Sequence, residues 1–109
     1  SYPTKENESY LQNINFLRKK FSVPIGLSDH TNEIKTSIIS YCMGTKIFEK
    51  HFMLKNDKTC VDFPVSLDFT KFNQMRLEME NIENIIGKVK FGVKKNEKQA
   101  KQFKRYKIE

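Results

Sequence analysis

The chain has 109 residues, of which 38% are hydrophobic and 30% are charged, and its formal net charge is +7. This length allows one domain at most, and no apolar run approaches the roughly 20 residues of a membrane-spanning helix. The first ten residues are polar and lack the apolar segment of a secretory signal. The two cysteines, Cys42 and Cys60, match no spacing of a metal site or a disulfide framework. We therefore expect a reduced, cytoplasmic protein without a membrane partner.

The excess positive charge is concentrated at the C-terminal end. Basic and acidic residues are equal in number up to Gly87, whereas residues 88–109 hold nine basic and two acidic residues. A solvated basic linker is the favoured interpretation, and an arm that binds nucleic acid or another anionic partner is the alternative. Because the segment contains no recognisable nucleic-acid motif, we expect no nucleic-acid partner.

The rest of the chain alternates helical and strand periodicity. Apolar residues at three- and four-residue spacing predict helices over residues 7–21, 32–44 and 67–87. Short apolar runs predict strands over residues 23–27 and 46–52. Helix, strand, helix, strand and helix in this order favour an α/β fold, with the two strands adjacent, parallel and joined by the second helix.

The second helix is expected to bury one apolar face. The residues that share this face are Ile34, Ile38, Tyr41 and Cys42.

Polar side chains stand at the carboxyl end of each predicted strand. The two-residue period places Ser28 and His30 on one face of the first strand, and Glu49 and His51 on one face of the second. In parallel α/β barrels this end of the strands carries the chemistry. Asp29 lies on the opposite face, where we expect it to cap the following helix.

Two neutral imidazoles at neighbouring strand ends can bind one divalent cation. Glu49, on the side of His51, is a candidate ligand, ligand partner or acid/base group. The alternative is that both histidines are ordinary polar residues of the strand ends. Residue type alone makes Asp62, in the loop after the second strand, and Tyr2 weaker candidates.

Five segments, taken in order, resemble the sialic acid synthase family, which includes N-acetylneuraminate, legionaminate and pseudaminate synthases. They are SYPT (1–4), VPIGLSDHT (23–31), GTKIFEKHFML (44–54), VD (61–62) and SLD (66–68). The resemblance implies that residues 1–87 are the C-terminal portion of a (β/α)8 TIM barrel, about two and a half βα units. It further implies that residues 88–109 are a linker towards a small antifreeze-like domain. We expect the chain to be a fragment of a larger protein.

The same resemblance implies a reaction. Family members condense phosphoenolpyruvate with an N-acetylated amino sugar, similar to N-acetylmannosamine, in its open-chain aldehyde form; a nonulosonic acid and phosphate result. It assigns a divalent cation, typically Mn²⁺, to His30 and His51. It also assigns the phosphoenolpyruvate phosphate to Ser28 and the sugar to Tyr2 and Asp62. Where many members have Gly-Pro-Asp, this chain has Cys60, Val61 and Asp62.

Two further expectations follow from this interpretation. The fragment alone should be inactive, because the family's phosphoenolpyruvate-binding lysines and closing arginine lie elsewhere in the barrel and its C-terminal domain. The open edge of a parallel sheet favours association with a second copy, so we expect a homo-oligomer, a dimer in the simplest case. The competing hypothesis is a non-enzymatic binding module whose basic tail engages anionic partners.

Overall fold

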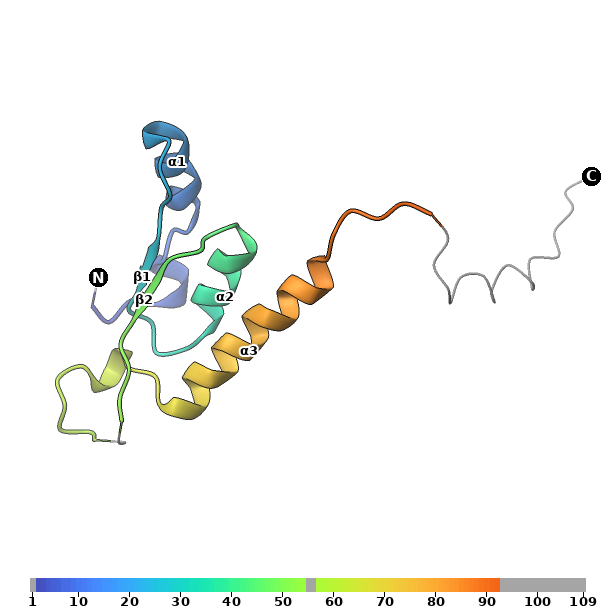
Figure 1. Ribbon diagram of the computed structural model, residues 1–109. Helices are drawn as coiled ribbons and strands as arrows, with labels where there is room; N and C mark the ends of the chain where they lie inside the picture. The colour runs from blue at the N-terminus through green and yellow to red at the C-terminus, as the bar shows by residue number, and fades with distance from the viewer. Residues whose placement is uncertain (1, 55–56, 93–109) are drawn as a thin grey trace, which may run out of the picture.

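The computed structural model describes residues 2–54 and 57–92 (Figure 1). The expected linker over 88–109 therefore lies mostly outside the described residues. The elements are η1 (Glu6–Glu8), α1 (Gln12–Phe21), β1 (Leu27–Asp29), α2 (Lys35–Cys42), β2 (Phe48–Lys50), η2 (Phe63–Val65) and α3 (Phe69–Ile86). Their order confirms the predicted alternation and the α/β class.

The strands β1 and β2 are adjacent and parallel, and α2 connects them, as predicted. Ser28 pairs with Glu49 in the register, so the residues that follow the strands, His30 and His51, are brought side by side. Further backbone contacts extend the arrangement at the carboxyl ends. The Thr4 amide donates to the His30 carbonyl oxygen at 3.1 Å, and the Leu67 amide donates to the His51 carbonyl oxygen at 2.9 Å. Four segments of the chain thus meet where the strands end.

The strand boundaries differ from the expected ones, since β1 begins at Leu27 and not at residue 23. Pro24 has no amide hydrogen to donate; the first cross-strand bond runs from the Leu27 amide to the Ile47 carbonyl oxygen at 2.9 Å. Gly26 allows this close approach, because a Cβ atom there would lie 2.9 Å from the same oxygen. The apolar run therefore leads into the strand and does not form it.

The helix α3 matches its predicted range of 67–87 closely. Asp68 is its N-cap, and its Oδ1 accepts a hydrogen bond from the Lys71 amide at 2.8 Å. Gly87 ends the helix with a φ of +59°, a conformation that side chains disfavour. The first helix is shorter than expected, because Tyr10, with φ of +43°, separates η1 from α1.

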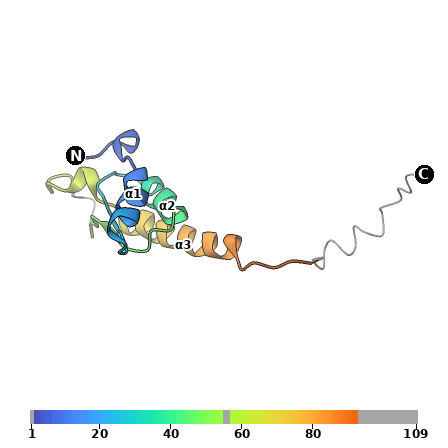
Figure 2. The ribbon, with the colours of Figure 1, turned by 90° about the horizontal axis from the view of Figure 1, so that it is seen from above.

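The helix α2 contacts both β1 and α3 (Figures 1 and 2). Its buried residues are Thr36, Ser37 and Ser40. Of the expected apolar face, Ile34, Ile38 and Tyr41 are only half-buried and Cys42 is exposed, so the prediction that this face is the buried one is wrong. A hydroxyl-bearing face is buried because it has polar partners: Ser37 Oγ donates to Asp29 at 2.6 Å, and Ser40 Oγ donates to Thr45 at 2.8 Å.

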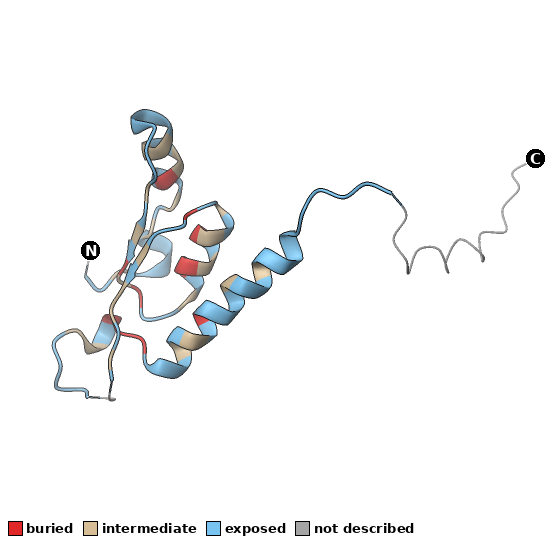
Figure 3. Ribbon diagram, viewed as in Figure 1, coloured by how far each residue is buried: buried red, intermediate tan, exposed pale blue. Residues whose placement is uncertain are grey.

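Little of the apolar surface is enclosed within the described residues. The buried hydrophobic residues are Ile14, Val65, Leu67 and Met75. Large side chains elsewhere remain open to solvent, and Figure 3 shows most of α1 and α3 as exposed. The described residues thus form an open layered unit with the strand ends accessible.

Candidate active site at the strand ends

The imidazoles of His30 and His51 lie next to each other directly after β1 and β2. Their ring centroids are 5.2 Å apart, with the ring planes tilted by 55°. The His51 side chain is 34% exposed. This proximity follows from the parallel register, because residues that occupy equivalent positions after paired strands share one edge of the sheet.

A hydrogen-bonded chain connects Ser28, Glu49 and His30 on the same face. Ser28 Oγ donates to Glu49 Oε1 at 2.6 Å and lies 3.0 Å from His30 Nε2. Because the hydroxyl has a single proton and Glu49 accepts it, Ser28 Oγ accepts from the Nε2–H of His30. That tautomer leaves a lone pair on His30 Nδ1, which is buried and has no hydrogen-bond partner among residues 2–54 and 57–92.

Tyr2 and Asp62 complete the cluster from two other segments. The Tyr2 hydroxyl donates to Asp62 Oδ1, and the Tyr2 ring lies 5.2 Å from the His30 ring and 6.0 Å from the His51 ring. Asp62 Oδ2 lies 3.6 Å from His51 Nδ1, longer than a hydrogen bond. The hydrogen bond to Asp62, together with burial and the Asp62 charge, raises the pKa of Tyr2 to about 12. The Tyr2 hydroxyl therefore keeps its proton at neutral pH and acts as a hydrogen-bond donor.

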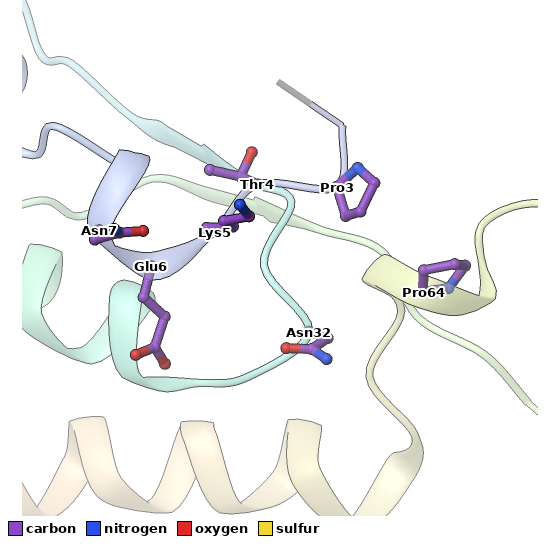
Figure 4. Close-up of a pocket in the computed structure, with 7 residues that line it drawn as sticks. All are labelled: Pro3, Thr4, Lys5, Glu6, Asn7, Asn32 and Pro64. Carbon is purple, nitrogen blue, oxygen red and sulfur yellow. The ribbon is translucent and has the colours of Figure 1, made fainter.

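Hollows flank this cluster. One of about 460 Å³ is lined by His51 and Asp62 together with apolar side chains, Phe52 and Phe63 among them. A smaller hollow of about 170 Å³ reaches Ser28 and His30. A third of about 640 Å³ lies between the N-terminal segment, the loop that carries Asn32 and η2, which carries Pro64 (Figure 4); no histidine lines it. The first two hollows give small molecules access to the candidate residues.

The opposite face of the two strands differs from expectation. Asp29 does not cap the following helix: the N-cap of α2 is Ile34, which makes no side-chain capping bond. Asp29 instead forms a buried ion pair with Lys50, with 3.2 Å between Oδ1 and Nζ. Burial lowers the pKa of Lys50, and the Asp29 charge opposes that effect.

The sequence holds a signal for this pair that the periodicity argument did not use. Ser28 and Glu49 are 21 positions apart, and the same offset relates Asp29 to Lys50 and His30 to His51. Three consecutive polar pairs at one offset predict three cross-strand contacts once the strands are taken as parallel and adjacent.

The side chains present fit a divalent cation that takes part of its ligands from solvent or substrate. Within the part of the chain that the structure describes, no group of three or more His, Cys, Asp or Glu side chains could hold a metal ion. The histidine pair nevertheless offers two neighbouring nitrogen donors. Buried polar atoms usually have a hydrogen-bond partner, and His30 Nδ1 has none among the described residues, so it is available to a cation. Two imidazoles with open positions are typical of catalytic cation sites.

No described helix is both long and apolar enough to cross a membrane.

Known proteins resemble this chain over most of its length. Pseudaminic acid synthase of Campylobacter jejuni is 34% identical over 87 residues, which cover 80% of this chain and 25% of the relative. The N,N'-diacetyllegionaminic acid synthase of the same organism is 30% identical over 97 residues, 89% of this chain and 28% of the relative. The chain thus spans about a quarter of the length of the curated relatives it matches.

A solved structure has the same arrangement. The sialic acid synthetase of Leptospira borgpetersenii, determined in complex with citrate, superposes with a TM-score of 0.75 at 28% identity, covering 94% of this chain and 36% of that one. The family model described as the NeuB family matches residues 1–91. The strand-end cluster therefore stands in a chain that belongs to the NeuB family.

Proposed function

We propose that residues 1–87 are the C-terminal portion of a (β/α)8 barrel, about two and a half βα units, and that residues 88–109 are a basic linker towards a C-terminal antifreeze-like domain. The parallel β1–β2 pair with its connecting helix supports this proposal. Phe16 and Ile47 are 62% and 59% exposed. Such apolar side chains would be covered by the further strands and helices of a barrel.

We infer that the whole protein is a nonulosonic acid synthase. In this proposal it condenses phosphoenolpyruvate with an N-acetylated amino sugar similar to N-acetylmannosamine, consumes one water molecule and releases phosphate. The observation that carries the proposal is the convergence of polar side chains from four segments at one end of the parallel strands. The converging residues are Tyr2, Ser28, His30, Glu49, His51 and Asp62. The named activities of the two Campylobacter relatives support the same class of reaction.

Tyr2 and Asp62 are assigned to the amino sugar. The Tyr2 hydroxyl donates to Asp62 Oδ1 and so fixes the carboxylate. The other oxygen, Oδ2, is too far from His51 for a hydrogen bond. A carboxylate oxygen held in this way can accept a hydrogen bond from a sugar hydroxyl. The apolar hollow beside Asp62 can receive the acyl group that such a sugar carries.

Ser28 and Glu49 are assigned to phosphoenolpyruvate and to proton transfer. Bond formation between the enol carbon and the aldehyde carbon places negative charge on the aldehyde oxygen, which must gain a proton. Water that adds to the phosphate-bearing carbon as phosphate leaves supplies this proton. The Glu49 carboxylate, at the accepting end of the chain from His30 through Ser28, can accept a proton from that water, since the contacts of the chain are 2.6 and 3.0 Å. When phosphoenolpyruvate is bound, the Ser28 hydroxyl would donate its single proton to a phosphate oxygen in place of Glu49.

His30 and His51 would hold the divalent cation, which we propose to be Mn²⁺. When bound, such a cation polarises the aldehyde oxygen. We further propose that the protein is cytoplasmic and acts as a homodimer, and that residues 1–109 alone do not turn over.

Phosphate release by the full-length protein tests this function. We expect release only when phosphoenolpyruvate and an N-acetylated amino sugar are both present, and we expect chelation to abolish it and added Mn²⁺ to restore it. Omission of either substrate is the control. A purified, folded protein that releases no phosphate with N-acetylmannosamine or with diacetamido sugars would contradict the assignment.

A further inference from the structure

A second polar cluster occupies the face of β1 and β2 opposite the histidines. Its centre is the ion pair of Asp29 and Lys50, whose side chains are 1% and 2% exposed. Thr31 and Ser37 surround the carboxylate and are also buried. None of these side chains takes part in the proposed chemistry. Asp29 nevertheless directly precedes His30 in the chain, and Lys50 directly precedes His51.

Lys50 binds the chain that leaves β1. Its Nζ donates to the carbonyl oxygen of Thr31 and, at 3.1 Å, to the carbonyl oxygen of Glu33. It also lies 3.3 Å from Thr31 Oγ1. An ammonium group on β2 therefore holds the backbone that begins one residue after His30.

Asp29 holds the same backbone from the other direction. Its Oδ1 accepts from the Thr31 amide at 2.9 Å and from Thr31 Oγ1 at 2.8 Å. Its Oδ2 accepts from Ser37 Oγ at 2.6 Å, which connects the strand end to α2. His30 thus lies between two residues that are fixed by one buried network, and His51 follows the lysine of that network.

Stability alone is a weak explanation for this arrangement. Apolar residues of similar size commonly replace a buried ion pair without loss of stability. What apolar residues cannot supply is the pair of bonds from Lys50 to the backbone carbonyl groups of Thr31 and Glu33.

We propose that Asp29 and Lys50 are positioning residues that hold the imidazole of His30 against that of His51, and so set how tightly the protein binds its divalent cation. This inference rests on the proposed function only in assuming that the two histidines hold a cation. Groups that orient metal ligands commonly contribute about 10- to 100-fold to metal affinity.

The test measures Mn²⁺ affinity of the full-length protein by titration calorimetry, together with thermal unfolding. The double variant Asp29→Asn with Lys50→Met removes both charges and keeps the side-chain sizes, so no buried charge remains unpaired. We expect its unfolding temperature to stay close to that of the wild type, while its Mn²⁺ affinity falls by about tenfold or more. Wild-type affinity in the folded double variant would overturn the inference.

A matched control comes from the same loop. Lys71 contacts the Glu33 carboxylate at 2.6 Å but is 42% exposed and touches no backbone carbonyl group of the loop among the described contacts. Lys71→Met should leave Mn²⁺ affinity unchanged. If Lys71→Met weakens affinity as much as the double variant does, loss of any nearby positive charge explains the result and the inference fails.

A milder variant decides the question if the double variant does not fold. Thr31→Val removes the hydroxyl that contacts both Asp29 and Lys50 and leaves the two charges paired. We expect Mn²⁺ affinity to fall by about threefold to fivefold, the effect of one hydrogen bond; unchanged affinity would overturn the inference. Wild-type protein that binds no Mn²⁺, or binds it equally after His51→Ala, would instead reject the proposed cation site.

Discussion

Both faces of the β1–β2 pair carry polar side chains, but the two faces differ in how completely these side chains are hydrogen-bonded. On one face, His30 Nδ1 has no hydrogen-bond partner among the described residues, and Asp62 Oδ2 lies 3.6 Å from His51 Nδ1, too far for a hydrogen bond. On the other, the carboxylate of Asp29 accepts three hydrogen bonds and pairs with an ammonium group. The first face is open to solvent and incompletely bonded, whereas the second is closed and fully bonded. This difference fits our proposal that the first face binds ligands while the second holds the strands that present it.

The largest expected effect is on the open face. His30→Ala or His51→Ala in the full-length protein should reduce turnover by on the order of 100-fold or more, because each would remove a ligand of the cation proposed to polarise the aldehyde oxygen. Phosphate release under saturating substrates measures this effect. Activity that persists in both variants after exhaustive chelation would show that the histidines are ordinary polar residues of the strand ends.

A large loss of stability is expected on the closed face. Lys50→Met leaves the buried Asp29 carboxylate without its partner, and breaking a buried pair in this way costs about 3–5 kcal/mol of unfolding free energy. Urea denaturation measures the change, and Glu6→Gln, which breaks an exposed contact with Lys35, is the control with no expected shift. A Lys50→Met protein as stable as the Glu6→Gln protein would remove the contrast between the faces.

The sequence predicted the open face better than the closed one. Strand alternation placed Ser28, His30, Glu49 and His51 on one face, and the observed register brings them together. The same rule put Asp29 opposite but gave it a capping role, since a carboxylate before a helix is usually a cap.

Hydrophobic periodicity could not predict contacts between distant segments of the chain. The serine and threonine side chains of α2 are buried because Asp29 and Thr45 meet them, and a hydrophobic pattern cannot anticipate such partners. Tyr2 and Asp62 are 60 positions apart; the residues alone made them weak candidates, and only the family resemblance assigned both to the sugar. The start of β1 was predicted too early because an apolar run resembles a strand. Pro24 in that run has no amide hydrogen for strand pairing.

A smaller effect is expected at the edge of the open face. Asp62→Asn should raise KM for the amino sugar by about tenfold, as loss of a charged hydrogen-bond partner does, and should leave Mn²⁺ affinity close to the wild-type value. Steady-state kinetics with each substrate varied separately distinguishes the two effects. An increase confined to the KM of phosphoenolpyruvate would place Asp62 at the other substrate.

The smallest effect concerns Tyr2. Because Asp62 raises the pKa of Tyr2 to about 12, Asp62→Asn should lower this pKa towards the ordinary 10.0. The phenol would then lose its proton at lower pH than in the wild type. A pH titration of ¹³C-labelled tyrosine by NMR, with Tyr2→Phe used to assign the signal, measures the shift. An unchanged pKa would mean that the two side chains are not in contact in solution.

We propose that His30 and His51 bind one cation together, and spectroscopy of the bound ion tests this directly. Pulsed electron paramagnetic resonance on Mn²⁺ bound to the full-length protein detects directly coordinated nitrogen atoms. We predict two imidazole nitrogen couplings in the wild type, and one in each of His30→Ala and His51→Ala. Bound Mn²⁺ that shows no nitrogen coupling, or couplings that neither substitution changes, would contradict joint binding by the two histidines.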